Sequence, residues 1–399
     1  MNTFVKRARA FDAPERLAYV NALFIIGTLG TLITPALLAA WAPLKWSQSQ
    51  QGLVAALELV TLAAGSLSGL YWQRLWNWQR VTLTGLVLAV LANGVCVVST
   101  DFVTVCLARG VVGLGGGLLS AVYSAFLANT PHPSRLIAST TFIQICVEAA
   151  MLLSSASVFE RLGGPGLFGL MALLLLLLIF PVSVLPRGWP LQPAGPAQVG
   201  AAASPDAKAH PVSWRGYPIL LSFLPFVIVQ TGLYTFLGEF GRLAAHLSLE
   251  VTLRGIAISV VLSSLGAIAA YVLDDRGGLW LPIGGSILVM AGATLGTILG
   301  SHSMAAFVAN AGGLQMGWIF LNCYLYSALI QANNLLVPAA TPVSAFGSAL
   351  GASVMGYVLE RGGLIGALSL SIAALGLTAL LTLPFLGRSV RMQPAARSI

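Results

Sequence analysis

Charge is the scarcest property of this sequence of 399 residues. Only 8% of the residues are Asp, Glu, Lys or Arg, whereas 57% are hydrophobic. A soluble domain usually has about 25% charged residues, so this chain has too few to cover the surface of a water-soluble fold. Disorder is excluded for the same reason, because disordered segments combine low hydrophobicity with high charge. The composition therefore predicts an integral membrane protein whose partner is the lipid bilayer.

Signatures of catalysis and of cofactor binding are also missing. The sequence has no G-x-x-x-x-G-K-[ST] phosphate loop, so it does not support ATP-driven transport. It has no H-E-x-x-H motif, and its four histidines are scattered. The four cysteines lie in predicted spans without paired spacing, which indicates free thiols. We expect no enzymatic activity, no metal and no other cofactor.

Long apolar runs are what the sequence has instead. Such runs favour membrane-spanning helices over the shorter alternations of a β-barrel, and each span needs about 20 apolar residues. We expect an all-α membrane protein with twelve transmembrane helices. The segment 186–216, rich in Pro, Ala and Gly, predicts a linker between an N-terminal six-helix bundle, 1–185, and a C-terminal one, 217–399. The expected spans are 19–42, 51–70, 81–99, 103–127, 136–158, 165–185, 217–238, 252–273, 279–300, 304–330, 335–358 and 364–386.

The distribution of basic residues predicts the topology. Of the 20 Lys and Arg residues, fourteen lie in the termini, the linker and the loops expected on the same side, and five lie near the opposite loops. Basic residues accumulate on the cytoplasmic side of membrane proteins. We therefore expect both termini in the cytoplasm and the chain in the cytoplasmic (inner) membrane. The formal net charge of +8 follows from this topology, so no nucleic-acid partner is expected. We also expect a monomer.

The two halves share short sequences at a spacing of about 200 residues. The segment 158–164, VFERLGG, recurs as 358–363, VLERGG, and 123–127, YSAFL, recurs as 326–330, YSALI. A six-span unit repeated in the same orientation is typical of transporters whose halves are related by an axis along the membrane normal. The repeat therefore predicts a transporter that works by alternating access.

With these features the chain resembles the major facilitator superfamily over essentially its whole length. In that family the loop after the second span resembles G-x-x-x-D-R-x-G-R-K. Here it contains Gly69 and Arg74, with Gln73 in place of the acid, and the second copy contains Asp275 and Arg276. The resemblance implies that such Asp–Arg pairs hold the cytoplasmic ends of neighbouring helices together. The degraded first copy departs from that pattern.

The fourth span carries the most specific local match, to the family signature R-x-x-x-G-x-G-x-G. It is formed by Arg109, Gly113, Gly115 and Gly117. Glycines four residues apart lie on one stripe and allow close approach of a neighbouring helix. The fifth span lacks the Gly-Pro signature of drug antiporters, and this departure argues against a typical multidrug antiporter.

Three ionisable residues lie well inside predicted spans: Glu58, Arg109 and Glu148. A charge at the centre of a span costs about 2.5–3.5 kcal/mol, so such residues face the protein interior or water. At 1.5 Å of rise per residue all three lie at similar depth in the outer half, and we expect an arginine with two carboxylates. One cation cannot compensate two anions, so one carboxyl is expected to bind and release a proton. The alternative is a static ion pair, and for Arg109 substrate contact and charge balance both stay open.

Polar residues at helical spacing predict a cavity between the halves. In the fifth span they share one stripe with Glu148, and in the C-terminal half they are amide and aromatic residues. Taken singly, each is equally explained by a hydrogen bond between packed helices. The candidates are Thr141, Gln144, Gln230, Tyr234, Gln315, Trp318, Asn322 and Tyr326.

The function expected from these patterns is secondary active transport of a small organic solute driven by protons. The missing Gly-Pro signature favours uptake by symport over the alternative, proton-antiport efflux of drug-like compounds or metabolites. A hypothesis of another class is a sensor or a lipid scramblase on the same scaffold. A sensor would carry an added cytoplasmic domain, which this sequence does not show.

Overall fold

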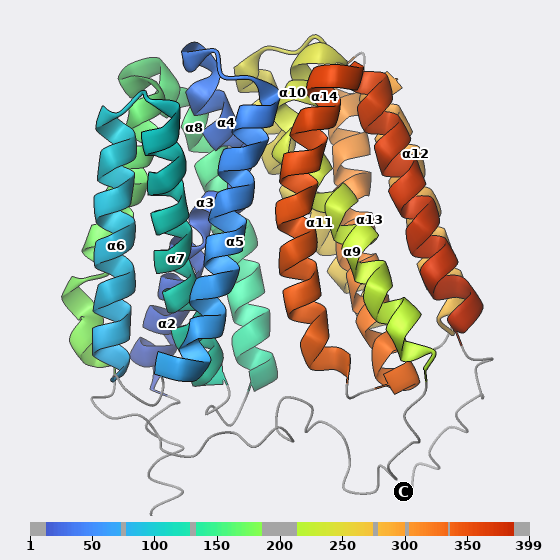
Figure 1. Ribbon diagram of the computed structural model, residues 1–399, viewed down its shortest axis with the longest axis horizontal. Helices are drawn as coiled ribbons and strands as arrows, with labels where there is room; N and C mark the ends of the chain where they lie inside the picture. The colour runs from blue at the N-terminus through green and yellow to red at the C-terminus, as the bar shows by residue number, and fades with distance from the viewer. Residues whose placement is uncertain are drawn as a thin grey trace, which may run out of the picture.

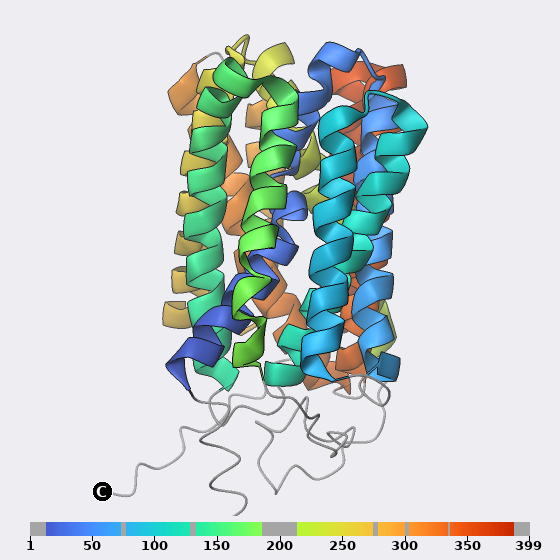
Figure 2. The same ribbon diagram turned by 90° about the vertical axis from the view of Figure 1, so that its left-hand side faces the viewer.

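The computed structural model describes residues 13–72, 77–127, 133–185, 214–273, 278–299, 303–333 and 336–386. Every regular element in these ranges is a helix. Figures 1 and 2 show the helices standing side by side in two groups, with the long ones running the full height of the molecule. The predicted all-helical fold class is confirmed by this architecture.

In the first half, the first predicted span is divided among three short helices. The fifth and sixth predicted spans lie in one long helix. The helices are α2 (Pro14–Gly27), α3 (Leu29–Leu32), α4 (Thr34–Trp41), α5 (Gln48–Trp72), α6 (Trp78–Val98), α7 (Phe102–Leu127) and α8 (Pro133–Leu177), with the 3₁₀ helices η1 (Ala42–Leu44) and η2 (Phe180–Val184).

The second half repeats this arrangement. The seventh predicted span is divided between two helices, and the eleventh and twelfth lie in one long helix. The helices are α9 (Gly216–Thr235), α10 (Leu237–Leu243), α11 (Leu249–Leu273), α12 (Trp280–Leu299), α13 (Met304–Asn333) and α14 (Val337–Thr382), followed by η5 (Leu383–Phe385). Nine helices in the described residues are long and apolar enough to cross a membrane. Because two of them hold two spans each and the first span is divided, the structure is consistent with twelve spans.

Two glycines in equivalent positions of the repeat break the two longest helices. Gly163 in α8 has φ 67° and ψ −171°, and Gly363 in α14 has φ 59° and ψ −154°. L-amino acids rarely adopt such positive φ values, whereas glycine does so at little cost. Figure 1 shows α14 reaching one edge of the molecule and turning back. The glycines of the repeated VFERLGG and VLERGG segments therefore form the turns between paired spans.

We expect Gly163→Ala and Gly363→Ala each to lower stability by about 1–3 kcal/mol, because the new side chain would be held in a strained backbone conformation. Gly363 isolates this effect, since a Cβ there would meet nothing within 4 Å. The measurement is the melting temperature in detergent. Gly376→Ala is the control, because that site also lies in α14 with nothing within 4 Å of a Cβ. Equal melting temperatures for Gly363→Ala and Gly376→Ala would contradict the prediction.

Helix packing follows the same pattern in both halves. In the first half α7 packs against α5 and α6, and in the second half α13 packs against α11 and α12. These helices are the fourth and tenth spans, which hold equivalent positions in the two sequence copies. The packing therefore supports the parallel repeat that the sequence predicts. The boundaries predicted for the linker stay a prediction, because most of 186–216 lies outside the described residues.

The two halves contact each other closely where α5 begins. Four alanines of α5 and α14, among them Ala349 and Ala352, form a buried cluster there. A Cβ on Gly52 would lie 2.5 Å from the carbonyl oxygen of Ala352. The amide of Ser49 donates a hydrogen bond of 3.0 Å to the carboxylate of Glu360. We call this region, residues 48–59 of α5 and 349–360 of α14, the closed end.

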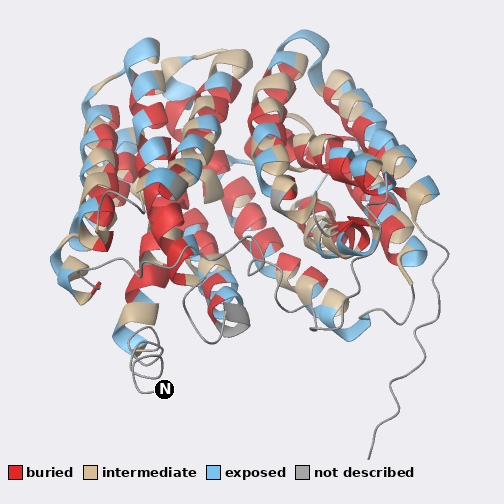
Figure 3. Cartoon of the chain, turned by 60° about the horizontal axis from the view of Figure 1, so that its bottom comes forward, coloured by how far each residue is buried: buried red, intermediate tan, exposed pale blue. Residues whose placement is uncertain are grey.

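Large apolar side chains cover much of the outer surface. Val98, Tyr271 and Leu288 are among those that are almost fully exposed. Figure 3 shows buried residues inside each half and exposed ones around the outside. In a soluble protein such exposed apolar area would be exceptional, whereas on a membrane protein it faces lipid. The surface therefore agrees with the multi-pass membrane protein that the composition predicts.

Candidate functional site

A buried ion pair joins α5 and α7. The Nε atom of Arg109 donates to Glu58 at 3.0 Å, and its Nη2 atom lies 2.5 Å from both carboxylate oxygens. Arg109 is 0% exposed and Glu58 is 5% exposed. The remaining Nη1 atom donates to the side-chain oxygen of Asn93 on α6 at 3.2 Å. The ring of Phe168 on α8 lies 5.9 Å from the guanidinium carbon. The guanidinium of Arg109 is therefore enclosed by protein groups from three other helices.

The predicted close approach at the glycines of α7 is confirmed. A Cβ on Gly113 or Gly117 would collide with the backbone of α5, and one on Gly115 would collide with the backbone of α6. Gly69 on α5 packs against α7 in the same way. These contacts bring α5 close enough for the carboxylate of Glu58 to reach Arg109. The remaining motif residues, Arg74, Asp275 and Arg276, lie outside the described residues.

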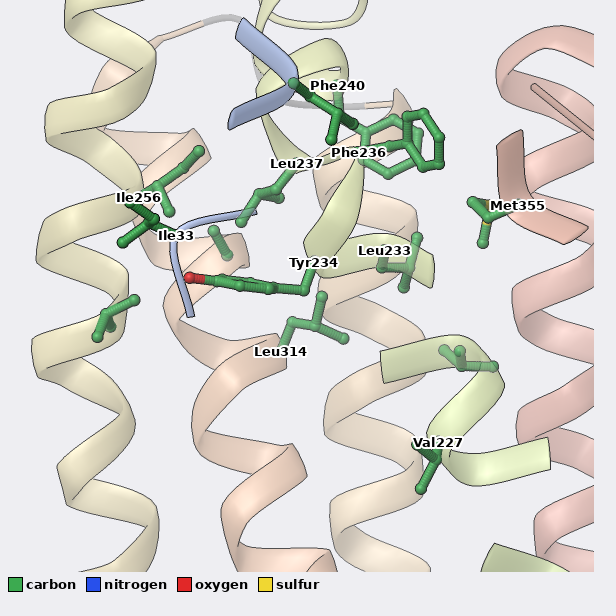
Figure 4. Close-up of a cluster of buried hydrophobic side chains, with 14 of the residues drawn as sticks. Ile33, Val227, Leu233, Tyr234, Phe236, Leu237, Phe240, Ile256, Leu314 and Met355 are labelled. Atoms are coloured by element: carbon green, nitrogen blue, oxygen red, sulfur yellow. The ribbon is translucent and has the colours of Figure 1, made fainter. Parts of the chain in front are cut away.

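A second polar contact involves Glu148 of α8, which is 8% exposed. The hydroxyl oxygen of Tyr234, near the end of α9, lies 2.5 Å from the carboxyl oxygen Oε1 of Glu148. The same hydroxyl oxygen lies 2.5 Å from the backbone carbonyl oxygen of Leu32 at the end of α3. Figure 4 shows the hydroxyl of Tyr234 pointing toward the chain segment that carries Ile33. We call these three groups the oxygen triad; they come from the fifth, seventh and first spans.

The carbonyl of Leu32 is free to join this triad because the first span is broken there. In a continuous helix its partner would be the amide of Ala36. That amide instead donates to the carbonyl of Ile33 at 2.9 Å. Pro35 has no N–H, so it also removes a helical hydrogen bond at this point. The break therefore leaves a backbone acceptor inside the protein, as in the discontinuous helices of transporters.

The seventh span is broken at the equivalent place. Ile33, between α3 and α4, has φ −105° and ψ 26°, and Phe236, between α9 and α10, has φ −99° and ψ 14°. The two residues are about 200 positions apart, like the other repeated segments. The oxygen triad thus joins the two breaks, since Leu32 lies one residue before Ile33 and Tyr234 lies two residues before Phe236. Each half therefore contributes a residue next to a helix break to this one contact.

The predicted cluster of one arginine with two carboxylates is wrong. Arg109 pairs with Glu58, while Glu148 contacts Tyr234. The helix α3 contacts both sites. A Cβ on its Gly30 would collide with the side chains of Arg109 and Glu58. Its Leu32 contacts Tyr234, the partner of Glu148. Depth along a span can be read from the sequence, but the direction of a side chain around the helix axis depends on packing. The two acids therefore occupy separate sites.

The cavity candidates become more exposed with distance from the closed end. On α8 Glu148 is buried, Gln144 is half-buried and Thr141 is exposed; on α9 Tyr234 is buried and Gln230 is half-buried. These residues share a helix face with the oxygen triad, and we expect this face to lie between the halves. Their role in binding a substrate stays a prediction.

The candidates on α13 follow the same gradient. Gln315 is buried, and Trp318, Asn322 and Tyr326 are half-buried along the helix. The ring of Tyr326 packs edge-on against Phe223 of α9, with centroids 5.0 Å apart. Polar and aromatic groups from three spans are thus accessible on the side away from the closed end.

Sequence reasoning missed three contributors to these sites. Asn93 is fully buried beside Arg109, and an amide within an apolar span was the available signal. The acceptor at Leu32 is a backbone atom, so only Pro35, within the first predicted span, pointed to it. Gly30 makes room for the ion pair, and nothing in its sequence context distinguishes it from other glycines.

Comparisons with known proteins agree with this architecture. Residues 20–367 match the family model described as Major Facilitator Superfamily. A crystal structure of a point mutant of the nucleoside transporter NupG is similar, with a TM-score of 0.68 and 15% sequence identity. The match covers 93% of this chain and 98% of that chain. At this identity the likeness shows the fold alone. No curated protein matches the sequence.

Proposed function

The chain belongs to the major facilitator superfamily, and from this premise we propose that it couples the transport of its small solute to protons. The family makes it a multi-pass membrane transporter rather than an enzyme. The observation that carries the proton role is the environment of Glu148. It lies deep in the protein against a neutral hydroxyl, whereas the other deep acid, Glu58, is paired with Arg109.

A buried carboxyl that faces no cation is costly to ionise, because the charge loses its hydration without gaining a counter-ion. Glu148 is therefore neutral while it is enclosed. It loses its proton when the alternating motion of the two halves exposes it to water. A proton is thus carried across in each cycle. Arg109 balances the charge of Glu58 and does not contact substrate, since its guanidinium is fully enclosed.

The groups accessible between the halves favour an uncharged polar solute. Gln144, Gln230 and Asn322 offer amides, and Trp318 and Tyr326 offer rings. Amides can both donate and accept hydrogen bonds, and aromatic rings pack against apolar or planar parts of a ligand. The ion pair of Arg109 and Glu58 is buried, so it offers no free charge to a substrate. A neutral solute with hydrogen-bonding groups fits this set.

We also propose the direction and the orientation. With the termini in the cytoplasm, α5 begins on the outer side, so the closed end faces away from the cytoplasm. The polar residues are then accessible from the cytoplasmic side, and the structure is an inward-facing state of a monomeric carrier in the inner membrane. The absence of the drug-antiporter signature in the fifth span supports uptake by symport.

The test is transport in proteoliposomes with a library of neutral solutes that includes nucleosides, the class named for the structural neighbour. A substrate is found by counterflow, which needs no gradient. We then expect a pH gradient to drive its accumulation by the wild type. In Glu148→Gln counterflow should persist at a reduced rate, while accumulation falls to simple equilibration because the amide cannot carry a proton.

The control is Glu160→Gln, the same substitution at an exposed position of the same helix, which should accumulate like the wild type. Gradient-driven accumulation by Glu148→Gln at the wild-type level would refute the proton role of this residue. Accumulation by the wild type that ignores the pH gradient would refute proton coupling altogether.

A further inference from the structure

The oxygen triad has too few protons to satisfy both of its contacts unless Glu148 supplies one. The hydroxyl of Tyr234 has a single proton, and the carbonyl of Leu32 can only accept. Both O···O distances are 2.5 Å, so each contact needs a proton between its oxygens. This requires Tyr234 to donate to Leu32 and a protonated Glu148 to donate to Tyr234. With an ionised Glu148, one of the two contacts would be a repulsive approach of two acceptors.

We propose that Tyr234 is a positioning residue that makes the contact between the two broken spans depend on the proton of Glu148. This inference rests on the proton role proposed above and adds how the proton changes the conformation. The proton on Glu148 directs the hydroxyl of Tyr234 to Leu32, which ties α9 to α3 beside the closed end. In the described residues, the hydrogen bonds of Glu148 lead to the first span through this tyrosine.

Loss of the proton from Glu148 reverses the direction of the hydrogen bond between Glu148 and Tyr234. The proton of Glu148 passes to water, and the hydroxyl of Tyr234 turns to the carboxylate, because a hydrogen bond to a charged acceptor is stronger than one to a carbonyl. The carbonyl of Leu32 then has no donor, since the amide of Ala36 is engaged by Ile33. A part-buried carbonyl that loses its donor is less favourable than one that keeps it. Deprotonation therefore weakens the contact between α3 and α9 and favours opening of the closed end.

Most charged groups on the described elements around the triad are already paired, and in α14 the carboxylate of Glu360 accepts the hydrogen bond from Ser49. Across α3 lies the buried pair of Arg109 and Glu58, and the sequence of α4, TPALLAAW, contains no titratable residue. The charges of α10 and α11 pair within their own helices at exposed positions. These pairs are Glu239 with Arg242 and Glu250 with Arg254. A pH response of the closed end is therefore assigned to Glu148 if it is lost in Tyr234→Phe and kept when the exposed His246, between α10 and α11, is replaced by glutamine.

The experiment measures opening of the closed end without transport. A reporter cysteine, Ala349→Cys, lies in the buried cluster between α5 and α14, in a chain whose four native cysteines are replaced by serine or alanine. Its rate of labelling by a hydrophilic maleimide in detergent is measured from about pH 5 to about pH 9. The pH dependence of the thiol itself is corrected with an exposed reporter, Thr100→Cys, in the loop between α6 and α7. In the otherwise unchanged protein labelling should accelerate as pH rises.

The two substitutions at the triad should act in opposite directions. Tyr234→Phe removes the hydrogen bond to Leu32. Labelling at low pH should then be about five to ten times faster, the equivalent of one hydrogen bond. The labelling rate should also no longer depend on pH. Glu148→Gln keeps a donor at every pH, because its amide N–H can donate to Tyr234, so labelling should stay slow up to the highest pH. Tyr19→Phe is the matched control. Its hydroxyl also donates to a backbone carbonyl, that of Leu178 at 2.7 Å, but within one half, and it should behave like the unchanged protein.

A wild-type pH dependence in Tyr234→Phe would overturn the proposal, and so would labelling that does not change with pH in the unchanged protein. Neither result depends on a substrate or a gradient. Failure of proton coupling would appear instead as wild-type accumulation that ignores the pH gradient, so the two failures are distinguishable.

Discussion

Replacing Arg109 by methionine should destabilise the protein by about 3–5 kcal/mol, because the change leaves the carboxylate of Glu58 buried without a counter-ion. Methionine keeps much of the volume of the side chain, so the loss of charge and of hydrogen bonds dominates. The same change leaves the side-chain oxygen of Asn93 without its donor. The measurement is the melting temperature, or the half-life at a fixed temperature, of the purified protein in detergent.

The double variant Arg109→Met with Glu58→Leu separates charge from packing. Removing both members of a buried ion pair leaves no uncompensated charge and is often close to neutral. We therefore expect the double variant to recover most of the lost stability. Arg254→Met is the control, since that arginine forms a pair on the exposed start of α11 and surface pairs contribute about 0–1 kcal/mol. An Arg109→Met variant as stable as Arg254→Met would mean that water reaches Glu58.

A leucine at Gly52 should abolish accumulation of the substrate by preventing closure where α5 meets α14. A Cβ at this site would lie 2.5 Å from the carbonyl oxygen of Ala352 and 3.4 Å from the Cα of Gly356. Backbone atoms cannot move aside as a flexible side chain can, so the two helices must separate. Overpacking of this kind costs about 1–3 kcal/mol. Because the cost falls only on the state in which the two halves touch here, it shifts the equilibrium away from that state by about five- to 150-fold.

The expected results for Gly52→Leu are a folded protein, faster labelling of the reporter at Ala349→Cys, and loss of transport. Gly94→Leu is the matched control, because it introduces the same side chain into a span where a Cβ would meet nothing within 4 Å. If Gly52→Leu transported like Gly94→Leu, the contact between α5 and α14 would not be part of the transport cycle.

The membrane class, the spans and the repeat could be predicted from the sequence because they depend on local composition and on chain direction. An apolar run must cross the bilayer wherever it is placed, and the repeat is visible in the two segments that contain Gly163 and Gly363. The glycines of α7 were also informative, since residues four apart on a helix share a face in any fold. The break in the first span also had a signal, in Pro35.

The partners of the buried ionisable groups were decided only by the tertiary structure. The sequence places Glu58, Arg109 and Glu148 at similar depth, and this led to the prediction of one cluster. The folded chain inserts α3 beside the ion pair, which separates Glu148 from it and turns that acid toward Tyr234 of the other half. The sequence determines how deep a residue lies because rise per residue is constant along a helix. Which neighbour it meets depends on how the helices rotate and pack, and this is settled by close contacts such as those of Gly30 and Gly113, formed between residues far apart in the chain.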